Sequence, residues 1–445
     1  MRPVSLTIRA YQVGFGDCFL LSFAYARGES RHVLMDFGST SLPDDAPKDR
    51  MVEVARDIAE QCGGKLTAVV ATHRHKDHIS GFATADDGTG SGDIIRDLDP
   101  DLVVQPWTED PNLDPKATGT PPVDGQGKRI AALDGMHSVA GRALEDSQRL
   151  AFLPKGLKEE LAFLGDDNIK NESAVRNLMT MGRDRVYLNT GAPSRLDALL
   201  PGVKTFVLGP PTIDQTRTVL KQRSRDDAEF WHLRALRAFA GADGEDEFWR
   251  LRGLAADSEG AIGHGPKSSL FAEEFVRTRQ EPFPEETRWL ISKAQNMRGR
   301  QMRSIVRILD KAMNNTSLIL LMKVGRKSLL FPGDAQHENW AYALGEPKYQ
   351  KLLKDVDLYK VGHHGSLNAT PKSLWNRFAK KSAEPGPGRL KSLMSTMPGK
   401  HGHEETKTEV PRRTLTEKLK NESEFHSTHE LPGTDLFKDV VIPLR

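Results

Sequence analysis

The stretch Thr-His-Arg-His-Lys-Asp-His (72–78) decides what this chain can be. It follows an apolar run, Leu-Thr-Ala-Val-Val-Ala (66–71), of the kind that forms a buried strand. Three imidazoles and a carboxylate therefore gather within a few residues of a strand end, and these are the groups by which proteins bind zinc and related divalent metals. A lone histidine is usually structural or solvated. Because a metal site needs several ligands at once, this density favours a metal site over a polar surface loop.

The spacing within this stretch suggests how the ligands divide between metals. In a turn after a strand, His73 and His75 can point the same way and hold one ion. Asp77 and His78 point elsewhere and can hold a second ion a few ångström away. Two metals at such a spacing can clamp the attacking and leaving oxygens of a hydrolysis.

The His-x-His-x-Asp-His pattern resembles the signature of the metallo-β-lactamase superfamily. Two further motifs narrow the resemblance: the Val-Gly-Phe-Gly-Asp turn (13–17) and the Gly-His-His-Gly-Ser segment (362–366) are similar to those of the metallo-β-lactamase domain of ComEC-type competence proteins. The resemblance covers both ends of the chain and does not clearly cover its middle. It implies an α/β fold, an αββα sandwich with a helical insertion: residues 1–211 form its first half, 212–312 the insertion and 313–445 its second half.

The resemblance also assigns roles to residues of the second half. Asp334, at the end of the strand 328–331, is expected to bridge two metals, since each carboxylate oxygen can bind one ion. His363 is expected to be the last metal ligand. His364 would contact the scissile group or donate a proton, and Asp77 joins it as a catalytic residue. Ser366 would bind a phosphate oxygen.

Three polar residues are expected around the metals. By resemblance, Asp36 after the strand 32–38 braces the metal loop through hydrogen bonds. Asp17 lies at the edge of the site, or else is a solvated residue of an ordinary hairpin turn. Most superfamily members have another histidine ligand where this chain has Asn-Asn-Thr-Ser (314–317). Asn315, with Asn314 as the alternative, would reach the metal or the substrate there, or the asparagine simply caps the turn.

The cofactor expected from these ligands is a pair of divalent ions. Zinc suits the imidazole-rich set. The asparagine in place of a histidine is a weaker ligand, so manganese is the alternative for the first metal.

Composition places the chain among ordinary globular proteins. Its 445 residues carry a net charge of +2, which provides no strong electrostatic attraction to nucleic acid or membranes as a whole. Two cysteines cannot build a disulfide framework, which fits a reducing cytosol. No apolar signal core opens the chain and no apolar stretch is long enough to span a bilayer. We therefore expect a cytoplasmic protein without a membrane partner.

The expected activity is hydrolysis by a metal-activated hydroxide. The ComEC-like motif favours a phosphodiesterase or nuclease acting on DNA or another nucleic acid. Basic residues between 293 and 311 would contact phosphates, unless they form a solvated helix face. The alternatives are a hydrolase of cyclic nucleotides or other small esters, and a partner-dependent component with a latent metal site. In that last case the helical insertion would bind a second protein.

Hydrophobic periodicity predicts the other elements. Strands are expected over 5–13, 19–23, 32–38, 102–104, 185–188, 204–208, 318–322, 328–331, 355–361, 390–396 and near 440–442, helices over 47–62, within 129–181, after 80–82, over 371–380 and over 410–419, and a loop over 86–93.

Overall fold

The computed structural model describes residues 1–110, 171–212, 215, 314, 316–366, 370–401 and 409–444. The helices expected between 129 and 170, the basic segment 293–311 and Asn315 lie outside the described residues. The helical insertion expected over 212–312 lies outside them as well, apart from residues 212 and 215.

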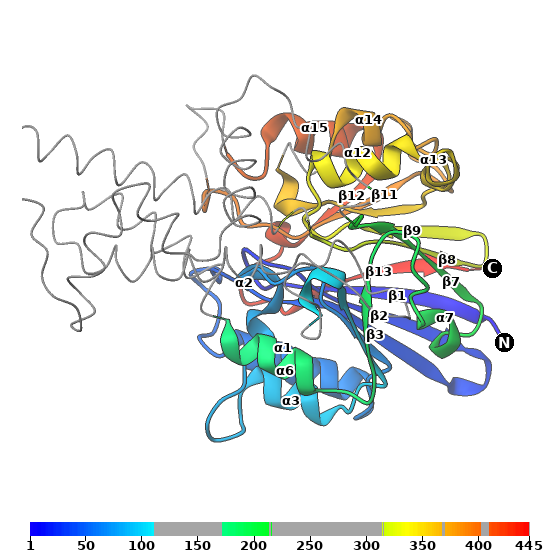
Figure 1. Cartoon of the computed structure of the whole chain (residues 1–445). Coiled ribbons are helices and arrows are strands. Elements are labelled where there is room, and N and C mark those ends of the chain that lie inside the picture. The colour runs from blue at the N-terminus through cyan, green and yellow to red at the C-terminus, as the bar shows by residue number, and fades with distance from the viewer. Residues whose placement is uncertain are drawn as a thin grey trace, which may run out of the picture.

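Two mixed β-sheets form the centre of the described structure (Figure 1). The first has the strand order β13-β1-β2-β3-β4-β5-β6, and the second has the order β12-β11-β10-β9-β8-β7. The strands of the first sheet are β1 (Pro3–Tyr11), β2 (Cys18–Tyr25), β3 (Ser30–Phe37), β4 (Ala68–Val70), β5 (Leu102–Pro106), β6 (Arg185–Leu188) and β13 (Phe437–Pro443). Those of the second are β7 (Val203–Gly209), β8 (Ile319–Val324), β9 (Lys327–Phe331), β10 (Leu358–Lys360), β11 (Lys391–Met394) and β12 (Glu424–Ser427).

The two sheets follow the same plan of strand directions. In the first, β13, β1, β2 and β3 are antiparallel, and β3, β4, β5 and β6 are then parallel. In the second, β7, β8 and β9 are antiparallel, and β9, β10, β11 and β12 are parallel. Parallel strands end at one edge of a sheet, and ligands commonly bind outside their carboxyl ends. Each sheet therefore presents one such edge.

Helices pack on each sheet (Figure 1). The helices near the first sheet are α1 (Arg50–Gln61), α3 (Ser91–Asp97) and α6 (Glu172–Thr180), and those near the second are α12 (His337–Gly345), α13 (Pro347–Lys354), the short α14 (Lys372–Trp375) and α15 (Arg413–Glu422). Two further short helices are α2 (Lys76–Ile79), which includes the last residues of the 72–78 stretch, and α7 (Leu196–Leu199), which precedes β7. Single 3-10 turns are η1 (Ala26–Gly28), η2 (Ser80–Phe82), η3 (Trp107–Glu109), η6 (His363–Gly365) and η7 (Thr428–Glu430).

Side-chain alternation along the strands divides the apolar residues among three cores. Leu6 and Ile8 of β1 face a central core that also contains Leu320 of β8 and Phe331 of β9, so this core joins the two sheets. A second core lies between the first sheet and α1, α3 and α6. A third lies between the second sheet and α12 to α15. The chain is thus a mixed α/β protein in which both faces of each sheet bury apolar side chains.

Most predicted elements within the described residues are confirmed to within a few residues. The helix expected over 47–62 is α1, and the strand expected over 5–13 is β1. The loop expected over 86–93 is wrong at its end, because α3 begins at Ser91. The helix expected over 371–380 is confined to the four residues of α14. Helices α12 and α13 and the strand β12 have no counterpart among the predictions.

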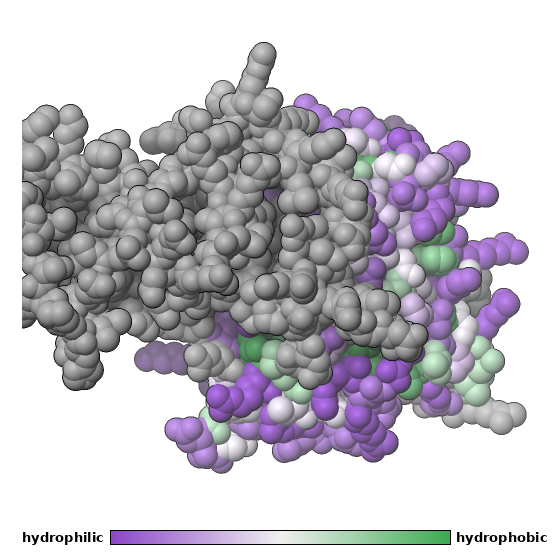
Figure 2. All heavy atoms as spheres, in the orientation of Figure 1, coloured by the Kyte–Doolittle hydropathy of each residue, from purple (hydrophilic) through white to green (hydrophobic). Residues whose placement is uncertain are grey.

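The surface of the described residues is mainly polar. Figure 2 shows hydrophilic side chains over most of the coloured face, with hydrophobic ones in small separate areas. Met1 and Val441 are the exposed large apolar side chains among the described residues. Within the same residues, none of the helices has the length and apolar character needed to cross a bilayer.

Candidate metal centre

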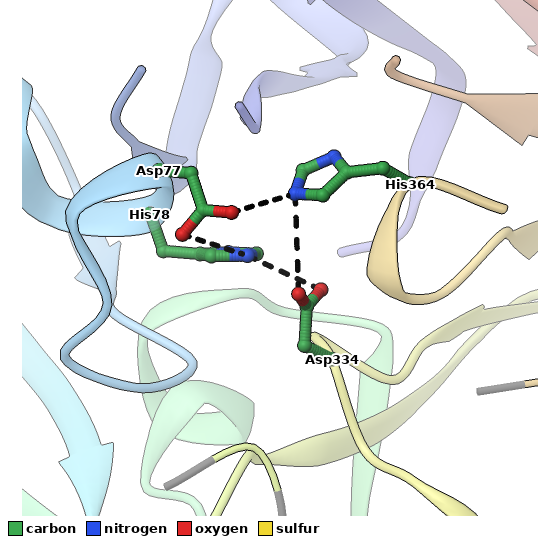
Figure 3. Close-up of side chains that lie close together, drawn as sticks. All are labelled: Asp77, His78, Asp334 and His364. Carbon is green, nitrogen blue, oxygen red and sulfur yellow. Dashed lines mark hydrogen bonds and ion pairs between the residues drawn. The ribbon is translucent and has the colours of Figure 1, made fainter. Parts of the chain in front are cut away.

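The predicted metal loop and the second-half motifs meet at the carboxyl ends of parallel strands. The loop 72–78 follows β4 of the first sheet and runs into α2. Asp334 follows β9, and His363 and His364 follow β10 in the second sheet. Figure 3 shows side chains from these segments pointing toward one another. The site therefore lies where the carboxyl edges of the two sheets come together.

Four side chains form the centre of this group: Asp77, His78, Asp334 and His364, and each offers one ligand atom within 4.8 Å of the others. The Nε2 of His364 lies 2.9 Å from Oδ2 of Asp77 and 3.9 Å from Oδ2 of Asp334. The Nε2 of His78 lies 3.1 Å from Oδ1 of Asp334 and 3.9 Å from Oδ1 of Asp77. Two imidazoles and two carboxylates thus alternate around one point (Figure 3).

Both imidazoles are held by the nitrogen that faces away from this point. The Nδ1 of His364 donates to the carbonyl of Ser395 at 3.0 Å, and a carbonyl can only accept, so Nδ1 carries a hydrogen. The Nδ1 of His78 donates to Oδ2 of Asp36 at 2.8 Å. Metal-binding histidines are commonly oriented in this way by a carboxylate or a backbone carbonyl. The two Nε2 atoms are thereby aimed at the centre.

Two buried atoms of the centre make no hydrogen bond. These are Nε2 of His78 and Oδ2 of Asp334. A buried polar group without a hydrogen bond is costly, and a cation between the two would satisfy both. With nitrogen and oxygen donors, the four residues fit a divalent metal such as zinc.

The charges of the centre are strongly coupled. Burial by itself lowers the pKa of His78, but the carboxylates of Asp334 and Asp36 raise it well above its ordinary value. Burial opposes the charged form of Asp334, yet His78 and His363 hold the pKa of that carboxyl well below its usual range. Burial likewise works against a charged His364, while its hydrogen bond to Asp77 raises its pKa. The centre is therefore built to keep its carboxylates ionised beside cations.

Asp36 holds the candidate metal loop, residues 72–78, in place through hydrogen bonds. Its Oδ1 accepts a hydrogen bond from the backbone N–H of Thr72 and its Oδ2 accepts one from the Thr72 hydroxyl, both at 2.7 Å, in addition to the bond from His78. Asp36 has a φ of 53°, an uncommon conformation for a residue other than glycine. The carboxylate ties both ends of the loop to the end of β3.

His73 and His75 lie together beside this centre. The Thr72 hydroxyl gives its one hydrogen to Asp36 and accepts from Nδ1 of His73 at 3.2 Å. The Nε2 lone pair of His73 then faces Nδ1 of His75 at 3.0 Å. Burial and the neighbouring His78 hold the pKa of His73 well below its ordinary value. The pair is suited to share one metal, although it joins no group of three His, Cys, Asp or Glu ligands among the described residues.

The two histidines of the Gly-His-His-Gly segment lie at different depths in the site. His364, expected to be catalytic, belongs to the central group. His363, expected to be the last ligand, is 29% exposed, and its Nε2 lies 4.0 Å from Oδ2 of Asp334. Its Nδ1 contacts the Ser366 hydroxyl at 2.9 Å, and its backbone N–H donates to Asp334 at 3.0 Å. Both histidines have positive φ in the tight turn η6, and the side chain of His364 is buried while that of His363 lies at the rim.

Asp17 lies deeper than a site edge. Its side chain is fully buried, with Oδ2 3.6 Å from Nδ1 of His78 and Oδ1 3.7 Å from Nδ1 of His364. The ammonium of Lys360, the last residue of β10, contacts its Oδ2. Burial raises the pKa of Asp17, and Lys360 is the largest opposing influence. The reading of Asp17 as a solvated turn residue is therefore wrong.

Several residues of the site are absent from the sequence-based predictions. Lys360 is one of them, and its signal is a lysine at the end of an otherwise apolar strand before Gly-His-His. The ring of Phe15 lies 4.3 Å from those of both His364 and His401. Mainly through burial, the pKa of His401 is lowered to about 4. Ser395 has no sequence signal, because it contributes a backbone carbonyl.

Models of known protein families and curated proteins contain no match to this chain.

Proposed function

We propose that this chain is a metal-dependent hydrolase with the αββα sandwich of the metallo-β-lactamase superfamily. One observation carries the proposal: two imidazoles, each held at Nδ1, direct Nε2 toward two buried carboxylates at the meeting edges of two sheets. Nε2 of His78 contacts Asp334 as an ion pair at 3.1 Å, while Oδ2 of Asp334 is buried without a hydrogen bond, so both atoms are suited to a cation between them. The strand directions and the helices over both sheets support the sandwich.

Some of these residues would bind the metal ions directly, and others would keep those ligands in position. Asp77, His78, Asp334 and His364 would hold one ion, and His73 with His75 would contribute to a second. When bound, two divalent ions would supply positive charge and lower the pKa of a water molecule for hydrolysis. Asp36 keeps the loop ligands in place through its three hydrogen bonds.

His363 is the imidazole available for proton transfer in this arrangement. It is partly exposed beside Asp334, and the Ser366 hydroxyl orients its Nδ1. General acids must reach the leaving group of the substrate, which a fully buried side chain such as His364 does less readily. We assign to His363 the proton-donating role and to His364 a ligand role, which exchanges the roles expected from the sequence.

The proposed substrate is a phosphodiester, with DNA or another nucleic acid as the first candidate. The support is the resemblance of the Gly-His-His-Gly-Ser segment to ComEC-type domains. A net charge of +2 provides no general attraction to nucleic acid, so recognition has to be local. A cyclic nucleotide or another small ester is the alternative substrate.

The experiment is a cleavage panel. Purified protein is incubated with linear and circular DNA, RNA, a cyclic dinucleotide and bis-p-nitrophenyl phosphate, each with Zn²⁺, Mn²⁺ or Mg²⁺. We expect cleavage that depends on metal and falls at least about 100-fold in Asp77→Ala and His364→Ala, because each removes a ligand. His426→Ala on β12 is the matched control, since His426 pairs with Glu424 outside the site.

Two results would contradict the proposal in different ways. If the protein retains no divalent metal after loading, the proposed metal centre is wrong. Protein that holds metal but cleaves none of these compounds would reject the phosphodiester and direct the search to amides, thioesters or a missing protein partner.

A further inference from the structure

A second acidic group lies directly behind the proposed metal centre. Asp17, Asp36 and His78 are all buried, and each offers a ligand atom within 4.8 Å of the others. This group shares His78 with the centre formed by Asp77, Asp334 and His364. By distance and donor type alone, a divalent ion could therefore settle in either of two adjoining places.

One of the two places already has a cation. Lys360 is 2% exposed, and its ammonium contacts Oδ2 of Asp17 and lies 3.9 Å from Oδ1 of Asp334. The ring of Phe19 lies 5.8 Å from the same nitrogen and closes its apolar side. The side chain comes from the end of β10, three residues before the turn that begins at His363. The lysine charge is thus built in at the boundary between the two acidic groups.

We infer that Lys360 is a resident cation that neutralises Asp17 and confines the divalent metals to the Asp77, His78, Asp334 and His364 side of the site. This inference rests on the proposed metal-dependent function and adds the determinant of where the metals bind. Lys360 is a positioning residue in this scheme, because it acts through Asp17 and Asp334.

The hydrogen-bond pattern explains why Asp17 needs a cation of its own. Nδ1 of His78 bonds Asp36 at 2.8 Å and Nδ1 of His364 bonds the Ser395 carbonyl at 3.0 Å. Asp17 lies farther from the same two atoms, at 3.6 and 3.7 Å. A buried carboxylate without a partner is strongly unfavourable. Without Lys360, Asp17 would have to draw these imidazoles or a metal ion toward itself.

Metal content is the primary test, because it needs no substrate. Wild-type protein and Lys360→Met are loaded with Zn²⁺, desalted and analysed by elemental mass spectrometry, with circular dichroism as the check of folding. We expect Lys360→Met to retain one more zinc per chain than the wild type. Adding Asp17→Asn to it should return the content to the wild-type value, since the acidic group that lost its lysine then also loses one of its two carboxylates. Lys327→Met removes a lysine paired with Asp357 at the opposite end of β9 and should leave the content unchanged.

A second variant keeps the inference testable if Lys360→Met does not fold. Asp17→Asn alone leaves the lysine charge directed at Asp334, so we expect zinc affinity to fall about ten-fold, the scale seen when a group supporting a metal ligand is lost. The double variant Asp17→Asn, Lys360→Met should recover that affinity. A double variant no better than Asp17→Asn would indicate a purely structural pair and overturn the inference.

The outcomes separate the inference from the function on which it rests. A wild type without bound metal would refute the proposed metal centre and the inference with it. A wild type that binds metal, with a folded Lys360→Met that binds the same number of ions, would refute the role of Lys360 alone.

Discussion

At the scale of single residues, the centre depends on side chains that touch no metal in our proposal. Asp36 accepts three hydrogen bonds from the loop, and the Ser395 carbonyl orients His364. Such supporting contacts decide which nitrogen of an imidazole faces the ligand, and their loss usually weakens metal binding. The chemistry of the loop therefore extends one layer beyond its ligands.

Asp36→Ala should weaken zinc binding by about 10- to 100-fold, because the loop and Nδ1 of His78 lose their shared acceptor. The measurement is a zinc competition titration with a chromophoric chelator. The control is Asp439→Ala. It removes a carboxylate on β13 that pairs with Arg9 of β1. Equal zinc affinity in Asp36→Ala and the wild type would show that Asp36 does not support the site.

At the scale of elements, close backbone contact holds the metal loop against the end of β3. A Cβ placed on Gly38 would lie 2.5 Å from the backbone of Asp77 and from the backbone nitrogen of His78. The neighbouring turn is also tied to the loop, since the backbone N–H of Asp17 donates to the carbonyl of Asp77 at 2.8 Å. The ends of β3 and β4 and the turn before β2 therefore form one packed unit.

Gly38→Ala should displace the start of α2 and lower the free energy of unfolding by about 1–3 kcal/mol, the usual cost of overpacking. Zinc affinity should fall together with stability, because Asp77 and His78 move. Gly386→Ala is the control, as a Cβ there meets nothing within 4 Å. Chemical unfolding of both variants tests this expectation, and an unchanged Gly38→Ala would disprove it.

At the scale of the whole molecule, the two halves of the chain are interlocked. Strand β7 comes before the expected insertion and yet pairs with β8 in the second sheet. Strand β13 comes last and pairs with β1 at the edge of the first sheet. The residues of the proposed metal centre come from both sheets, so they come together only when the sheets have packed through the central core.

The coupled charges give the metal-free protein a distinctive dependence on pH. The pKa values of His78 and His364 are raised above the ordinary 6.5, because carboxylates outweigh burial. Their stabilising contribution is complete below pH 6.5 and is lost as the pH rises through the higher folded values. The pKa of Asp334 is lowered from 3.8, so its contribution is lost only as the pH falls through that lower value.

We therefore expect the melting temperature of chelator-treated protein to fall as the pH is raised from about 6.5 into the alkaline range. Zinc should restore more stability at the upper end, because metal binding requires imidazoles without that proton. Thermal melts with and without zinc across this range test the expectation. A metal-free melting temperature that rises with pH would contradict it.

The sequence by itself determined the features that depend on neighbouring residues. Alternation within one strand decides which side chains face a core, so β1, β2 and β3 were predictable. The metal loop was recognisable because its donors are contiguous, from His73 to His78. The metals, the hydrolysis and the substrate stay predictions.

Only the tertiary structure decided what depends on distant parts of the chain. His364 meets Asp77 across 287 positions of sequence, and no local pattern says which of two adjacent histidines a left-handed turn will send inward. From the sequence, Lys360 is only a residue near the end of a predicted strand, and its contact with Asp17 appears only in the folded structure. The physical reason is the same in each case. Local sequence sets backbone conformation and amphipathic periodicity, whereas burial and charge pairing arise only when the two sheets pack together.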